Sequence, residues 1–275
     1  MILFKNKDIC VFQSALFCTT ATVIQTADLV LVVDPNWLPQ EVYAIQNFVR
    51  EIRKGRDLYL LFTHSDYDHI IGYQAFPDAK VIASKAFVEN PDKEAIIKQI
   101  KDWDEGFYIM RNYPISYPEV NIVVEKDAQQ LSIGSTNFTF YLAPGHNRDG
   151  IFTFVEWESK GVLFLGDYLS DVEFPFIYHS SEDYEKTLDK AAQLAQQPKF
   201  QIAIPGHGSL IHSNAEMAYR IKESRAYIQE LRQSIQNKQD YPTELLWQRY
   251  AFRKGMEHYH QGNVKLIAAA LHKAI

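Results

Sequence analysis

Four short apolar segments of the chain each lead directly into a histidine or an aspartate that stands beside small or turn-forming residues. The segments comprise residues 60–64, 141–146, 163–167 and 202–207. Short apolar runs bounded by turn residues are typical of strands buried inside a sheet. A glycine immediately precedes His146, Asp167 and His207, which allows the backbone to turn sharply there. The chain is therefore expected to form a sheet in which four metal-ligand residue types meet at one edge.

None of the four strand ends indicates a metal site by itself. A single histidine at a strand end is more often a hydrogen-bonded structural residue than a ligand, and Pro-Gly-His alone is a turn. The first segment, however, continues into the sequence His-Ser-Asp-Tyr-Asp-His at residues 64–69. Imidazole and carboxylate groups are common protein ligands of divalent metals. Because this run and the three later strand ends occur together, we interpret them as one metal site.

Strands and helices alternate through the first three quarters of the chain. Apolar and β-branched runs predict strands at residues 9–17, 21–25, 29–33, 58–62, 80–83, 121–125, 130–133, 137–142, 151–157, 161–165 and 200–204. The helical spacing of apolar residues predicts helices at 38–52, 91–103 and 181–196. Residues 107–118 are aromatic and irregular, which indicates a loop.

The last quarter of the chain has a helical pattern. A long helix is predicted over residues 214–236, capped by Asn214, and shorter helices near 243–253 and 264–274. No linker-like composition separates this part from the rest. We therefore expect a domain over residues 1–212 and a helical C-terminal extension, residues 213–275, packed on the same domain.

The overall charge argues against an extended nucleic-acid interface. The formal net charge is −6 and the pI is near 5.9, and the basic residues are scattered among acids. A small-molecule substrate is the expected partner. The oligomeric state is left open, with a homodimer as one option.

The N-terminal region bears on where the protein works. Cys10 and Cys18 could form one disulfide, but two thiols in a reducing cytosol are the simpler interpretation. The apolar stretch 9–18 contains Gln13 and Ser14 and lacks a small-residue cleavage site, so it predicts strands and not a signal peptide. No uninterrupted apolar run approaches the length of a membrane span. We expect a cytoplasmic protein without membrane contact.

On the motifs above, the sequence resembles the metallo-β-lactamase superfamily. The family's hallmark is Thr-His-x-His-x-Asp-His, followed by a Gly-His, a Gly-Asp and a final Gly-His. The resemblance extends from about residue 20 to residue 210 and includes Val33-Asp34-Pro35, which is similar to the family's strand-end aspartate. It implies an α/β fold of four layers, an αβ/βα sandwich of two packed sheets with helices outside.

The resemblance also implies how seven residues divide between two metals. The first metal would be held by His64 and His146, the second by Asp68, His69 and His207, and both by Asp167; Asp66, which replaces a histidine of the family, is expected to join the first. Two divalent ions, zinc in the first place, would hold a bridging hydroxide that attacks an ester-type bond. Asp68 would orient this water and is the expected catalytic residue. Asp34 is a candidate for holding a ligand histidine from outside, with a structural role at the strand end as an equal alternative.

One position departs from the family pattern, because Asp66 stands where the family has its second histidine. An oxygen ligand in place of a nitrogen ligand shifts the preference from zinc towards iron or manganese. The flavodiiron branch resembles this arrangement, with a glutamate at the equivalent place and two irons. The alternative is that Asp66 does not reach the metal, which would leave the first site weak or empty.

Three functions are consistent with these residues. The leading one is a metal-dependent hydrolase acting on a thioester, lactone or phosphodiester; antibiotic hydrolysis is disfavoured without an export signal. The second is a di-iron redox protein of flavodiiron type, reducing oxygen or nitric oxide, which would need a separate electron donor. A binding or sensor protein with a degenerate site ranks last, since six of the seven expected ligands match the family.

Residues that could select the substrate are harder to assign. Arg148 could meet an anionic substrate group, although a salt bridge is the simpler interpretation. His179 is a better candidate because it lies on a loop downstream of a predicted ligand. Aromatic residues could line an apolar pocket, but such clusters are more often core. They are Tyr168, Phe174, Phe176 and Tyr178, with Phe107, Tyr108 and Tyr113 earlier in the chain.

Overall fold

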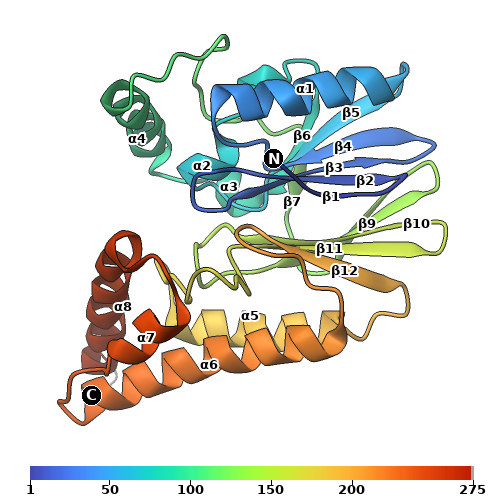
Figure 1. The fold of residues 1–275 in the computed structure, drawn as a ribbon. Helices are drawn as coiled ribbons and strands as arrows, with labels where there is room; N and C mark the ends of the chain where they lie inside the picture. The colour runs from blue at the N-terminus through green and yellow to red at the C-terminus, as the bar shows by residue number, and fades with distance from the viewer. Residues whose placement is uncertain (274–275) are drawn as a thin grey trace.

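Two β-sheets pack face to face in the computed structural model, which describes residues 1–273, and helices cover both outer faces (Figure 1). The first sheet has the strand order β1-β2-β3-β4-β5-β6-β7. Its strands are β1 (Ile2–Lys5), β2 (Ile9–Gln13), β3 (Thr20–Gln25), β4 (Leu29–Val33), β5 (Asp57–Leu61), β6 (Lys80–Ser84) and β7 (Ile122–Val124). Strands β1 to β4 pair antiparallel, and β4 to β7 pair parallel.

The second sheet has the order β12-β11-β10-β9-β8. Its strands are β8 (Gln129–Ile133), β9 (Thr136–Leu142), β10 (Ile151–Trp157), β11 (Lys160–Gly166) and β12 (Phe200–Pro205). Neighbours from β8 to β11 pair antiparallel, whereas β11 and β12 pair parallel. Strands β9, β11 and β12 therefore all end at the same edge of this sheet.

Helices complete the outer layers. Helix α1 (Pro39–Arg53) covers the first sheet, and α5 (Ser181–Leu194) and α6 (Asn214–Gln236) cover the second (Figure 1). The remaining helical elements are α2 (Tyr67–Ile70), η1 (Tyr73–Ala75), α3 (Lys85–Val88), α4 (Lys93–Gly106), α7 (Glu244–Arg249) and α8 (Arg253–Lys273). This αβ/βα arrangement confirms the predicted fold class.

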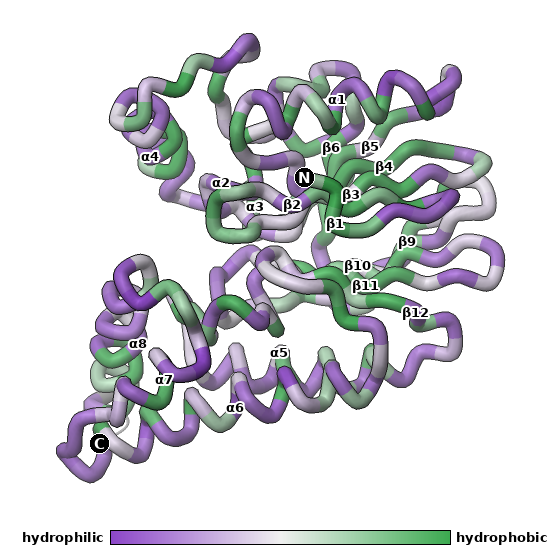
Figure 2. Tube along the Cα trace, viewed as in Figure 1, coloured by the Kyte–Doolittle hydropathy of each residue, from purple (hydrophilic) through white to green (hydrophobic). Residues whose placement is uncertain are grey.

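Burial on both faces explains why the central strands are apolar throughout. Successive side chains of a strand point to opposite faces. In β4, Leu31 enters the apolar cluster between the two sheets, whereas Val30 and Val32 join the cluster beneath α1. Figure 2 shows hydrophobic residues concentrated along the strands of both sheets. A strand covered on both faces reads as a continuous apolar run and not as an alternating one.

The two sheets are joined at the edge where the strands end. The backbone N–H of Ile151 donates to the carbonyl of Thr63 at 2.8 Å, and that of Thr20 donates to the carbonyl of Gly206 at 2.7 Å. Each of these bonds connects one sheet with the other. The segments that follow β5, β9, β11 and β12 are thereby held together, as the strand-end pattern predicts.

Two elements predicted in the first half of the chain were wrong in extent, and one strand was missed. The strand predicted over 9–17 ends at Gln13, because residues 14–19 turn back on themselves with Phe17 and Cys18 at positive φ and Ser14 N–H bonded to the Thr19 carbonyl. Strand β1 was missed: Ile2, Leu3 and Phe4 are apolar, but the strand is only 4 residues long and lies mostly exposed at the sheet edge. The helix predicted over 91–103 is shifted to Lys93–Gly106.

The C-terminal helices also differ from the prediction. The cap of α6 is Ser213, whose hydroxyl accepts the N–H of Glu216, and not Asn214, which is already helical. Helix α8 is continuous from residue 253, whereas the pattern predicted a start near 264. Its two glycines each cost about 1 kcal/mol of helix propensity, which burial of Met256 and Ile267 offsets. The predicted end at residue 274 lies outside the described residues.

Packing links the C-terminal helices to the sandwich. Met217 and Ile228 of α6 and Met256 and Ile267 of α8 belong to the same apolar cluster as Leu163 of β11. The boundary between residues 212 and 213 stays a prediction. No helix within residues 1–273 is both long and apolar enough to cross a membrane. Cys10 and Cys18 are free thiols.

Candidate metal centre

The segment after β5 places its four candidate ligands in two directions. Asp66, the residue preceding α2, has an extended backbone with φ −60° and ψ 143°. Asp68 and His69 lie within the first turn of α2 itself. This change from extended to helical backbone between residues 66 and 68 separates His64 and Asp66 from Asp68 and His69.

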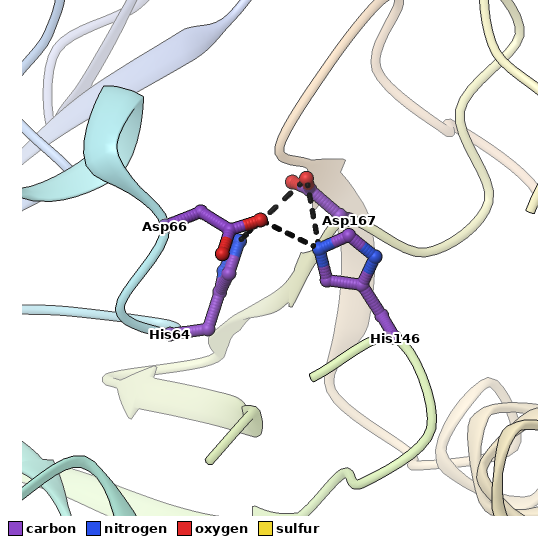
Figure 3. A group of neighbouring side chains, drawn as sticks. All are labelled: His64, Asp66, His146 and Asp167. Carbon is purple, nitrogen blue, oxygen red and sulfur yellow. Dashed lines mark hydrogen bonds and ion pairs between the residues drawn. The ribbon is translucent and has the colours of Figure 1, made fainter. Parts of the chain in front are cut away.

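The first cluster consists of His64, Asp66, His146 and Asp167, whose side chains point towards one another (Figure 3). Oδ2 of Asp66 lies 3.1 Å from Nε2 of His146 and 3.6 Å from Nε2 of His64. Oδ2 of Asp167 lies 3.3 Å from Nε2 of His146 and 3.6 Å from Nε2 of His64. Asp66 is therefore long enough to join the group, the point on which the sequence left two possibilities.

The second cluster consists of Asp68, His69 and His207. Nε2 of His69 lies 3.4 Å from Nε2 of His207, and Oδ2 of Asp68 lies 3.6 Å from the latter and 3.8 Å from the former. Asp167 contacts this cluster as well, with Oδ1 at 3.1 Å from His69 and Oδ2 at 3.3 Å from His207. All seven predicted residues are thus brought together, with Asp167 between the two groups.

The spacing within each cluster fits ligands around a metal ion. Ligand atoms about 2.0–2.1 Å from a tetrahedral ion lie about 3.3–3.4 Å from each other. Among the described residues, Nε2 of His64 and Oδ1 of Asp167 are buried without a hydrogen-bond partner. Oδ1 of Asp167 does lie 3.1 Å from His69, but the two groups are not aligned for a hydrogen bond. Buried polar atoms without partners are costly, and a shared cation would satisfy them.

The pKa values of the clustered side chains also favour a bound cation. Burial and His69 act to lower the pKa of His64, but Asp167 and Asp66 outweigh them and raise it to about 10. Burial opposes ionisation of Asp66, yet hydrogen bonds from His146 and His64 hold its pKa well below the usual range. Burial likewise opposes ionisation of Asp167, whose pKa His207 and His69 hold well below normal. The site therefore stabilises ionised carboxylates together with positive charge beside them, as a bound cation would supply.

Groups around the clusters orient the histidines. Oδ2 of Asp34 lies 2.9 Å from Nδ1 of His69 and 2.5 Å from the Thr63 hydroxyl, so Asp34 holds both the ligand and the strand end. Nδ1 of His146 lies 2.8 Å from the carbonyl of Phe176. When Nδ1 donates to a carbonyl or a carboxylate, Nε2 is left as the lone-pair nitrogen that faces the cluster.

Two glycines are required by close approach at the ligands. A Cβ on Gly206 would lie 2.2 Å from Oδ1 of Asp167 and 2.9 Å from Cε1 of His69. Gly145 has φ +135°, and a Cβ there would lie 2.4 Å from Cα of Tyr184. Any side chain at these positions would displace a ligand or the start of α5, which explains the glycine before His146 and His207.

Two residues at the site were not found from the sequence. The side-chain amide of Asn147 donates to Oδ1 of Asp66 at 2.5 Å, which leaves Oδ2 directed at the histidines. Oε1 of Glu173 lies 3.9 Å from Nδ1 of His207, and burial raises the pKa of Glu173 to about 7. Only the position of Asn147 next to His146 could have suggested its role, because amides have no ligand pattern of their own.

The residues considered for substrate selection fall in different places. Phe174 and Phe176 are buried, as expected for core residues, whereas Tyr178 is half exposed with its ring 5.1 Å from that of His146. Phe107 and Tyr108 are exposed beyond the end of α4 and do not join them. His179 pairs with Asp183 at 3.7 Å. Arg148 lines a polar cavity of about 410 Å³ beside Asn147 and His179.

A profile of the metallo-β-lactamase superfamily matches residues 18–207, which span all seven residues of the two clusters. The chain belongs to the metallo-β-lactamase superfamily. The match ends shortly before α6, so the C-terminal helices lie beyond it. Comparison with curated proteins gives no significant match.

Solved structures show the same superfamily fold. A metallo-β-lactamase family protein from Thermus thermophilus has a TM-score of 0.60 at 20% identity, over 84% of this chain and 82% of that one. An archaeal superfamily protein from Sulfolobus tokodaii has a TM-score of 0.54 at 17% identity, over 79% and 86%. A B3 metallo-β-lactamase described as having an active-site glutamic acid has a TM-score of 0.52 at 20% identity, over 90% and 89%.

Proposed function

We propose that the protein is a metal-dependent hydrolase that cleaves an ester-type bond, such as a thioester, a lactone or a phosphodiester, in a small molecule. The observation that carries the proposal is the position of Asp167, whose carboxylate lies within 3.6 Å of a histidine nitrogen in each of the two clusters. One carboxylate shared between two ligand groups is an arrangement that suits a pair of divalent ions. Bound there, such ions would supply Lewis acidity and lower the pKa of water.

The residues of the chain would have separate tasks. His64, Asp66 and His146 would hold one ion, Asp68, His69 and His207 the other, and Asp167 both. Oδ2 of Asp68 accepts the hydroxyl of Thr19 at 3.3 Å and faces His207. Its Oδ1 would accept a proton from the attacking water, which makes Asp68 the proposed general base. Asp34 and Asn147 would keep His69 and Asp66 in place.

Zinc is the proposed metal, with iron or manganese as the alternative. The first cluster contains two histidine nitrogens and two carboxylates, and an oxygen-rich set suits harder ions than a three-histidine set does. A relative of the same fold is described as having an active-site glutamic acid, so a carboxylate at the active site has a parallel. The same carboxylate supports the second candidate function, a di-iron redox protein that takes electrons from a separate donor.

Metal reconstitution with two kinds of assay tests the proposal. The purified protein would be stripped with a chelator, reloaded with zinc, manganese or iron, and assayed on p-nitrophenyl esters, acyl thioesters and bis(p-nitrophenyl) phosphate. Hydrolysis that depends on metal and is lost in Asp167→Asn is the expected result. Absence of hydrolysis with every metal would contradict the proposal, and donor-dependent oxygen consumption by the iron form would favour the redox function instead.

A further inference from the structure

A cavity of about 630 Å³ lies between the C-terminal helices and the metal clusters. Its walls come from three segments far apart in the sequence: the turn at residues 15–18, the loop at 172–176, and residues 251–259, which lead into α8 and form its first turns. Its volume is within the range of about 300–1,000 Å³ found for small-molecule sites. The cavity lies largely outside the superfamily match, since one complete wall comes from residues beyond 207.

The lining of this cavity is mainly apolar. Phe17, Phe176, Met256 and Tyr259 contribute side chains to it, and Phe252, whose side chain is 60% exposed, lies on its rim. The ring of Tyr259 stacks on that of Phe176 with their centroids 4.1 Å apart. Aromatic and thioether groups of this kind make favourable contact with hydrocarbon and little with water.

Two walls of the cavity lead to the proposed metal ligands, none of which lines the cavity itself. On one side, the carbonyl of Phe17 lies 2.9 Å from Nδ1 of His207, and Glu173, also a lining residue, lies 3.9 Å from the same atom. On the other side, Tyr259 packs against Tyr178, whose ring in turn packs against that of His146. The cavity is thus separated by single intervening residues from one ligand of each cluster. The polar cavity that contains Arg148 and Asn147 adjoins the His146 side through Tyr178.

We propose that this cavity binds an unbranched apolar chain attached next to the scissile bond, so that the C-terminal helices give the hydrolase a preference for esters of medium-length fatty acids or alcohols. The proposal rests on the proposed hydrolase function, because the chain is placed relative to a bond that reacts at the metals. An apolar chain fits the lining, and the contacts with Phe17 and Tyr259 place its reacting end beside the ligands. The acyl side and the alcohol side of an ester share this chemistry, and the assay separates them.

Helix α8 offers a matched pair of variants. Gly255 lines the cavity and Gly262 lies two turns further along the same helix, outside the lining. Both are exposed, and a Cβ on either would have nothing within 4 Å. A side chain can therefore leave the backbone at either position without a clash at its Cβ. Gly255→Trp is designed to obstruct the cavity, and Gly262→Trp makes the same helical change elsewhere. Phe252→Asp adds a charge at the exposed rim and serves as a second obstructing variant.

Two series of substrates measure the preference in the metal-loaded protein. One varies the acyl group of p-nitrophenyl esters from acetyl to octanoyl, and the other varies the alkyl group of acetate esters from ethyl to octyl. Full burial of one methylene corresponds to about a fourfold gain. We expect kcat/KM to rise at least about tenfold with chain length in one series. The rise should be lost in Gly255→Trp and Phe252→Asp and kept in Gly262→Trp. A flat response in both series, or an equal loss in both glycine variants, would overturn the proposal.

A binding measurement keeps this test apart from that of the hydrolase function. Octanoate and acetate would be titrated into the zinc-loaded wild type and the two glycine variants by calorimetry. Octanoate should bind at least about tenfold more tightly than acetate, and Gly255→Trp alone should remove the difference. If this holds without turnover, the hydrolase function fails and the cavity stands. Equal affinities for the two acids, or dimerisation of the wild type that Gly255→Trp abolishes, would overturn the assignment of the cavity to an apolar chain.

Discussion

Replacing Asn147 with alanine tests whether Asp66 acts as a ligand of the first metal. The side-chain amide of Asn147 donates to Oδ1 of Asp66 at 2.5 Å, and Oδ2 of the same carboxylate faces His146 at 3.1 Å. Without the amide, the carboxylate is free to rotate and to turn Oδ2 away. The variant should therefore weaken metal binding at the first cluster and leave the second cluster, which Asn147 does not contact, unchanged.

The size of the effect follows from the type of hydrogen bond. A hydrogen bond to an ionised carboxylate contributes about 1.5–3 kcal/mol. The side chain of Asp66 is 25% exposed, and water partly replaces the lost donor, so the lower end of that range applies. About 1.4 kcal/mol corresponds to a factor of ten in an equilibrium constant. We expect metal affinity at the first cluster to fall about tenfold, which is the lower part of the about 10–100-fold range typical of residues that support a ligand.

Competition with a chromophoric chelator measures the affinity for each of the two metal equivalents separately. Asn121→Ala is the control, since the side chain of Asn121 also makes a hydrogen bond, accepting the N–H of Val81 at Oδ1, but lies away from the clusters. Affinity for one equivalent should fall in Asn147→Ala and for neither in Asn121→Ala. Unchanged affinity for both equivalents in Asn147→Ala, or an equal loss at both, would refute the assignment of Asp66 to the first metal.

Two other predictions concern stability. Burial raises the pKa of Glu173 to about 7, so the folded state favours the protonated carboxyl and loses stability as pH rises from about 4.5 to about 7. In the metal-free protein, Glu173→Gln should therefore raise the free energy of unfolding by up to roughly 3 kcal/mol at pH 8 and change it little at pH 4. Urea unfolding that shows no such pH dependence would contradict this. Phe164 is 2% exposed between the sheets, so Phe164→Ala should lower the free energy of unfolding by about 3–5 kcal/mol. Phe252→Ala, on the exposed rim of the apolar cavity, should change it by less than about 0.5 kcal/mol. Similar losses in the two variants would show that Phe164 is not packed between the sheets.

The fold and the seven clustered residues could be predicted because their signals are local. A buried strand has an apolar pattern that is visible in the sequence, and a ligand at its end needs only a neighbouring glycine to turn the chain. Asp66 was recognised as a departure from a known motif, but its reach depends on the backbone change at the start of α2. The structure shows that the seven residues converge; that they bind metal stays a prediction.

The features that could not be predicted depend on distant parts of the chain. Asn147 supports Asp66 across about eighty residues of sequence, and an amide side chain has no pattern that marks such a role. The apolar cavity forms only when residues 15–18, 172–176 and 251–259 meet. Strand β1 is held by pairing with β2 and not by burial. Helix α8 continues through Gly255 and Gly262 because its packing outweighs their low helix propensity.

Metal stoichiometry shows most directly whether the two clusters hold a pair of divalent ions joined by Asp167. The chelator-stripped protein would be reloaded, freed of excess metal, and measured by elemental analysis beside Asp167→Asn and the distant control Asn121→Ala. We expect two equivalents per chain in the wild type and in Asn121→Ala, and fewer than one in Asp167→Asn. Less than half an equivalent of zinc, manganese and iron alike in the reloaded wild type would contradict a two-metal site.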